Sequence, residues 1–120
     1  MTPLRIYLAI CLFAIATYTS VTIAHHGMNL LPVFLGDLAL MAWPGQFNLD
    51  FTGFLGLSAL WVAWRHRFSP GGLVLSVVAF FGGMLFLSIY LLVHSIRADG
   101  RIEVLLLGET RARQQRPAIA

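Results

Sequence analysis

Three histidines and one aspartate are the side chains best suited to chemistry, because each lies in or beside an apolar segment: His25, His26, Asp50 and His94. Two imidazoles on different helices could ligate haem iron. His25 and His26, together with Met28, offer nitrogen and sulfur to copper. A carboxylate near a histidine could bind a quinone or relay a proton. Ionisable groups in a membrane are costly, which makes these four residues the candidates for a functional site.

Each candidate also has a simpler structural explanation. His25 and His26 end a predicted helix, where imidazole can bond the last free carbonyl groups. Asp50 falls in the first turn of its predicted helix, where a carboxylate complements exposed N–H groups. His94 suits the headgroup level. No spacing matches a metal motif, and the single cysteine, Cys11, excludes an internal disulfide. We therefore expect no cofactor and no metal, with haem or copper as the alternative.

The composition predicts one integral membrane domain. The 120 residues are 58% hydrophobic and 11% charged, whereas a soluble domain carries about 25% charged residues. The net charge of +3 comes from arginine without lysine. Most of the arginines follow Ser95, so they suit membrane flanks better than a nucleic-acid surface. We expect the lipid bilayer, and no nucleic acid, among the partners.

Three apolar segments predict transmembrane helices, at about residues 6–24, 46–64 and 72–94. Crossing the hydrocarbon takes about 20 residues. The uncharged part of the central segment is shorter than this, so its helix must begin near Gln46 and place Asp50 about one turn inside. The prediction is an all-α fold within residues 1–95.

Two further segments complete the predicted fold. The apolar segment at about residues 31–43 can reach only ~21 Å as a helix. It is too short to span, which favours an interfacial or re-entrant helix on the outer side. Residues 96–120 read as a polar tail, partly disordered from Arg111 onwards.

The arginines also predict an orientation in a bacterial inner membrane. Arg5 precedes the first span, and Arg65 and Arg67 follow the second, so the N-terminus and the 65–71 turn are expected in the cytoplasm. Three spans then place the arginine-rich tail outside, against the same rule. This arrangement brings His25, His26, Asp50 and His94 toward the outer mouth of the protein.

Small side chains recur on one face of the central and third helices. Burial of apolar surface does not drive helices together in lipid, so small residues that permit close approach serve this purpose. They predict an antiparallel packing seam, with Gly45 outside it. The seam consists of Thr52, Gly56, Ala59 and Ala63 on the central helix and of Gly72, Ser76, Ala79 and Gly83 on the third.

The pattern from Trp43 through Gln46-Phe47-Asn48 and Asp50-Phe51 to Ala59-Leu60-Trp61-Val62, with Trp64-Arg65, is distinctive. It resembles small membrane-protein families of unknown function that are found in bacteria and have distant look-alikes in plants. The similarity covers about residues 40–95. It implies a three-helix membrane fold and carries no activity, cofactor or catalytic residue with it.

The function predicted from these features is not enzymatic. We expect a small accessory or scaffold subunit that packs in the membrane as a homo-oligomer or within a larger complex. One alternative is a redox or ion-handling module that uses His25, His26, His94 and Asp50. Another is a small transporter, which would have to work as an oligomer because three helices cannot enclose a pathway alone.

Overall fold

The computed structural model describes residues 1–115. Within them the chain forms helices joined by short turns and no strand, which confirms the all-α prediction for this part. The elements are α1 (Thr2–His26), α2 (Leu30–Leu40), α3 (Trp43–Arg65), α4 (Pro70–Arg97), α5 (Ile102–Leu107) and α6 (Glu109–Gln115).

Several of these helices are long and apolar enough to cross a membrane. Among the described residues, α1 and α4 each meet this condition, and α2 and α3 meet it together across a bend of 114°. These helices indicate a membrane protein, as the composition predicts.

The corner between α2 and α3 differs from the prediction in two ways. Met41 is left-handed (φ 54) and ends α2, so α3 begins at Trp43 with Pro44 in its first turn. Asp50 is therefore about two turns inside α3, and the helix has no acidic residue in its first turn. Gly45, expected outside the packing seam, is buried. A Cβ there would collide with the backbone carbonyl of Asp37.

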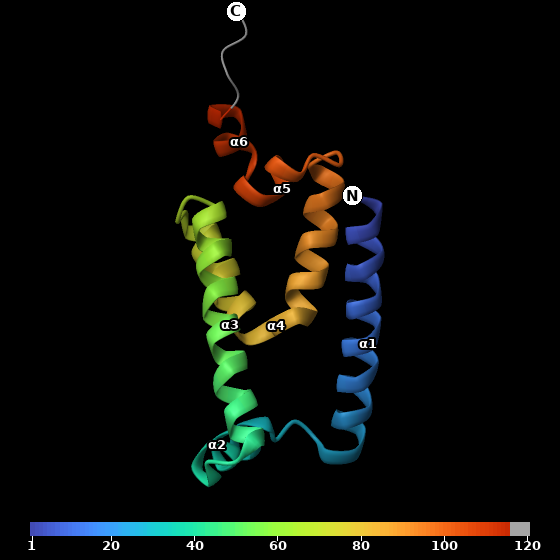
Figure 1. Cartoon of the computed structure of the whole chain (residues 1–120), viewed down its shortest axis with the longest axis vertical. Helices are drawn as coiled ribbons and strands as arrows, with labels where there is room; N and C mark the ends of the chain where they lie inside the picture. Colours follow the sequence, from blue (N-terminus) through green and yellow to red (C-terminus); the bar gives the residue numbers. More distant parts are fainter. Residues whose placement is uncertain (116–120) are drawn as a thin grey trace, which may run out of the picture.

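The segment 72–94, predicted as a straight span, instead folds back on itself within α4 (Figure 1). Gly83 interrupts the helix with φ 56 and ψ −142. If α4 were straight, Pro70 and Tyr90 would lie ~30 Å apart. Yet Tyr90 Oη lies 2.6 Å from Nε2 of His66, which precedes Pro70 by one short turn. We call residues 70–82 the first arm and residues 84–97 the second arm of this helical hairpin.

The hairpin brings both ends of α4 to one end of the molecule. Arg5 Nε donates to Ser95 Oγ at 3.1 Å and Arg5 Nη2 to the Ser95 carbonyl at 3.0 Å, which joins the start of α1 to the end of α4. The turn after α3 and the helices α5 and α6 lie at this end too (Figure 1). We call it the arginine end, because the described arginines lie here, and the opposite end the α2 end.

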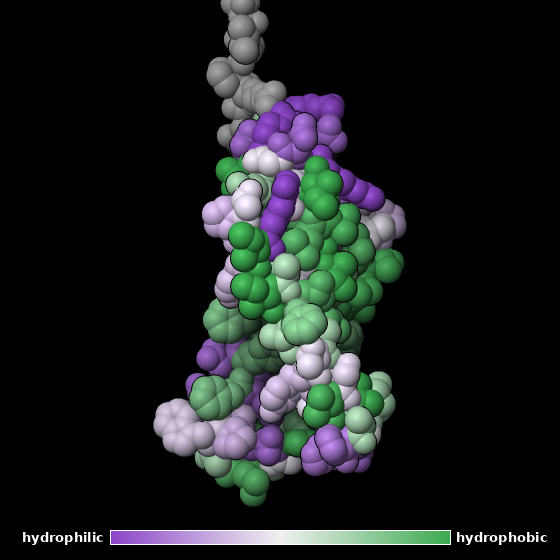
Figure 2. Space-filling view, turned by 90° about the vertical axis from the view of Figure 1, so that its right-hand side faces the viewer, coloured by the Kyte–Doolittle hydropathy of each residue, from purple (hydrophilic) through white to green (hydrophobic). Residues whose placement is uncertain are grey.

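The core of the protein is concentrated toward the arginine end. One cluster joins Val62 of α3 with Ala79 and Tyr90 from the two arms of α4. A second cluster lies under α5 and α6 and consists of Ala98, Val104, Leu105 and Ala112, with Met1, Leu4 and Leu91 packed against it. Figure 2 shows polar residues covering this end, with apolar surface directly below.

The tail is more ordered than the sequence suggests. Residues 102–107 and 109–115, within the segment predicted as a polar and partly disordered tail, form α5 and α6. Residues 111–115, where the sequence predicts disorder, belong to α6, and Ala112 lies in a buried cluster. The last part of that prediction, residues 116–120, lies outside the described residues.

Candidate functional site

Arg65 is the most deeply embedded charged side chain at the arginine end. Only 9% of its surface is exposed. Its guanidinium donates from Nε to the Leu105 carbonyl at 2.7 Å, from Nη2 to the Val104 carbonyl at 3.3 Å and from Nη1 to Tyr90 Oη at 3.1 Å. All three acceptors are uncharged, so these bonds hold the side chain without neutralising it.

The carbonyl acceptors belong to the last turn of α5, and the Val104 carbonyl also accepts from the Gly108 N–H at 2.9 Å. The last carbonyls of a helix have no partner within it, and they carry the negative end of its dipole. Arg65 satisfies two of them, and Trp61 Nε1 donates to a third, the Leu106 carbonyl, at 3.1 Å. Gly108 lets α5 end here, because a Cβ would lie 2.9 Å from the Arg65 carbonyl oxygen. Side chains of α3 thus cap the C-terminal end of α5.

Three rings surround the Arg65 guanidinium on its other side. Tyr90 is 5% exposed, and its ring centroid lies 5.9 Å from that of His66 and 4.3 Å from that of His94. The two histidine rings are 5.9 Å apart. The helical hairpin creates this cluster, because it returns the second arm to the turn that follows α3.

The hydrogen bonds of the cluster favour a neutral His66. Tyr90 Oη accepts from Arg65, so its own proton is free to be donated to His66 Nε2. This requires an unprotonated Nε2. Burial lowers the pKa of His66, and the nearby charge of Arg65 lowers it further. If His66 were protonated, Nε2 could no longer accept from Tyr90, and two positive charges, those of His66 and Arg65, would lie close together.

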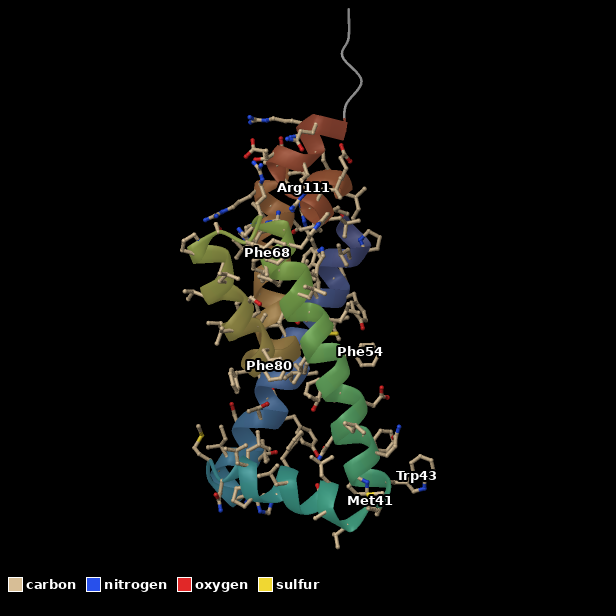
Figure 3. The ribbon with its side chains drawn as sticks, turned by 90° about the vertical axis from the view of Figure 1, so that its left-hand side faces the viewer. Met41, Trp43, Phe54, Phe68, Phe80 and Arg111 are labelled. Atoms are coloured by element: carbon tan, nitrogen blue, oxygen red, sulfur yellow. The ribbon has the colours of Figure 1, made fainter. Side chains whose placement is uncertain are left out.

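A surface pocket of about 220 Å³ opens beside this cluster. Its lining includes Arg65, His66, Arg67, Glu109 and Arg111. The Arg111 guanidinium stacks over the neighbouring Trp64 ring at 4.0 Å and also donates to the Trp64 carbonyl. Figure 3 shows Arg111 above the turn that carries Phe68. Three of these lining side chains are arginines, and one is a carboxylate.

The four residues predicted as an outer site do not meet. His25 and His26 are exposed at the α2 end of α1, with ring centroids 6.5 Å apart. Asp50 is exposed on α3 and has no ion pair among the described residues. His94 lies at the arginine end beside His66, because α4 folds back. The four-residue arrangement on one side of the membrane was therefore wrong.

The predicted seam between α3 and α4 forms only in its half nearer the arginine end. Ser76 Oγ donates to the Ala59 carbonyl at 2.8 Å, Gly72 packs on His66, and Ala63 and Ala79 are buried. Gly83 lies at the tip of the hairpin, where its Cβ position is 3.2 Å from Phe51 Cζ. Gly56 meets nothing within 4 Å, and Thr52 bonds its own helix at the Asn48 carbonyl.

Sequence reasoning missed the functional candidates of the arginine end. From the sequence, Arg65 is a topology marker, and neither His66 nor Tyr90 is predicted to take part in a functional site. The signal was present in the spacing of Tyr90 and His94, which places both on one helical face. Only the turn at Gly83 brings that face to Arg65, and nothing in the local pattern predicted it.

No group of three or more metal-binding side chains gathers within the part of the chain that the structure describes. Comparisons with family models, curated proteins and solved structures found no match. The resemblance to small bacterial and plant membrane proteins stays a prediction.

Proposed function

We propose that the protein crosses a bacterial inner membrane twice, with α1 and α3, and that α4 is a re-entrant hairpin that enters and leaves on the arginine side. The arms of α4 have 13 and 14 residues, or ~20 Å each, against a hydrocarbon thickness of ~30 Å. The α2 helix then lies along the opposite surface. The N-terminus is cytoplasmic, as the sequence predicts, and the C-terminal tail lies on the same side of the membrane.

The distribution of arginine supports this orientation. Positive residues next to membrane spans favour the cytoplasmic side. The hairpin gathers Arg5, Arg65, Arg67 and those arginines after Ser95 that the structure describes at one end (Figure 1). The conflict that three spans created, with an arginine-rich tail outside, is thereby removed.

Our functional proposal is a non-enzymatic accessory or scaffold subunit that associates through the halves of α1 and α3 nearest the α2 end. The main support for this proposal is that the α4 hairpin covers only part of the length of α3. Gly83 stops beside Phe51 and Leu55, so nothing from α4 covers α3 beyond this level. Each of α1 and α3 packs on α4 rather than extensively on the other, and Leu8 is the one buried residue of α1.

A partner helix fits this uncovered region better than lipid alone. The row of small residues that packs on the first arm at Ala59 and Ala63 continues to Gly56 and Thr52, and a Cβ at Gly56 would meet nothing within 4 Å. Helices in lipid associate where small residues allow their backbones to approach. The partner is a second copy of this chain or a larger membrane protein.

Association through Gly56 is tested by extraction in mild detergent and mass measurement under native conditions. We expect a particle heavier than the 13.3 kDa chain. Gly56→Leu should dissociate it, since added bulk separates the helices. The control is Gly36→Leu, which also enters open space and should leave the mass unchanged. A monomeric wild type, or equal effects of both variants, would contradict the proposal.

A further inference from the structure

The pocket beside Arg65 carries an unbalanced positive charge. Three arginines line it, Arg65, Arg67 and Arg111, against one carboxylate, Glu109. Glu109 is engaged elsewhere: its Oε1 accepts from Arg113 Nη2 at 2.6 Å, and this is the only ion pair within residues 1–115. His66 adds no charge when neutral. The lining side chains therefore give the pocket a net positive charge.

The cations of this pocket are held in place by different means. Arg65 is fixed by the α5 carbonyls and Tyr90, and Arg111 by its stacking on Trp64. Arg67 is exposed and has a left-handed backbone (φ 57), with no side-chain bond to another described residue. Its five N–H donors remain available. Two anchored guanidinium groups and one free group suit a ligand with several acceptor oxygens.

In the topology proposed above, on which this inference rests, the pocket lies at the cytoplasmic membrane surface. Arg5 and His25 lie 20 positions apart in α1, a rise of ~30 Å, which matches the hydrocarbon thickness. Arg5 bonds the end of α4 beside the pocket, and Trp61 and Trp64 flank it as interfacial residues do. Phospholipid phosphates lie at this level.

We propose that this pocket binds a phosphate group, supplied by the headgroup of an anionic phospholipid. Basic pockets between membrane helices on the cytoplasmic side bind such headgroups. The phosphodiester oxygens accept from Arg67 and Arg111, and Arg65 supplies positive charge from beneath. A soluble phosphate ester shares this chemistry, so the test separates the two sources.

The test measures thermal stability of the full chain in an uncharged detergent during titration with three probes. These are phosphatidylglycerol, phosphatidylcholine with the same acyl chains, and soluble glycerol phosphate. A ligand that binds the folded state raises the melting temperature saturably. We expect this from phosphatidylglycerol and not from the other two, with an effect that weakens as salt is added.

Arginine variants locate the site. Arg67→Gln should weaken the apparent affinity for phosphatidylglycerol about fivefold, the contribution of one basic residue near an anionic headgroup, and Arg67→Lys should recover much of it. The control, Arg97→Gln, removes the same charge at the same end outside the pocket and should change affinity less than twofold. Equal losses for Arg67→Gln and Arg97→Gln, or no saturable response, would overturn the pocket. Equal affinity for glycerol phosphate would overturn the lipid source.

Discussion

At the scale of residues, Arg65 illustrates how one side chain can have two structural roles. Its position after a tryptophan-rich span predicts a charge at the membrane surface, which its place at the arginine end matches. Its burial and its bonds to α5 carbonyls depend on a helix more than thirty residues later in the chain. Hydropathy and residue spacing do not predict the contact between Arg65 and α5, because the tail's helical order comes from packing rather than from its own sequence pattern.

His66 should make stability depend on pH. Its pKa in the folded protein is below the ordinary value of about 6.5. The unfolded chain therefore binds a proton first as the pH falls, so stability is fully present above about pH 6.5 and decreases below it. We expect the melting temperature in detergent to fall between pH 7.5 and pH 5.

The variant His66→Gln isolates this contribution. An amide oxygen can still accept from Tyr90 but does not titrate in this range. The variant should therefore lose less stability than the wild type over the same pH interval. If both proteins change by the same amount, His66 is not the titrating group.

Gly45 should be the glycine of α3 least tolerant of a side chain. Gly45→Ala would place a Cβ against the Asp37 backbone, and overpacking of this kind costs about 1–3 kcal/mol. Gly53→Ala enters open space in the same helix and should stabilise by up to about 1 kcal/mol, because alanine favours helix. Chemical denaturation in detergent measures both. A Gly45→Ala variant as stable as Gly53→Ala would contradict the α2–α3 corner.

At the scale of elements, α4 shows where sequence reasoning fails. A straight apolar helix and a helical hairpin of the same length have the same composition and hydropathy. Gly83 lies beside Phe51 of the central helix, but at the tip of a hairpin rather than within a straight seam. Its positive φ of 56 and the tertiary contacts of Tyr90 with His66 produce the reversal. These contacts are distant in sequence, so no local pattern reports them.

The hairpin should depend on glycine at position 83. Gly83→Ala forces a Cβ into a backbone conformation that alanine rarely adopts and brings it 3.2 Å from Phe51. Strain of this kind costs about 1–3 kcal/mol. Gly71→Ala, in the first turn of the same helix with open space around it, is the matched control and should be near neutral. Similar melting temperatures for the two variants would argue against the reversal at Gly83.

At the scale of the whole molecule, the membrane character, the helical fold and the break between α2 and α3 could be predicted from apolar segments and proline positions. The arginine distribution also disagrees with three spans, since three spans place the arginine-rich tail outside the cytoplasm, against the positive-inside rule. A fold in which α4 turns back resolves that conflict. The uncovered halves of α1 and α3 then become the main candidates for association.

The position of the C-terminus tests the reversal of α4 most directly. A reporter that reads its compartment would be fused after Arg67, after Ala120 and after Met41 in separate proteins. We expect the fusions after Arg67 and Ala120 to report the cytoplasm, because both ends of α4 lie at the arginine end (Figure 1). The Met41 fusion should report the opposite side. Arg67 and Ala120 fusions that report opposite sides would contradict the reversal of α4.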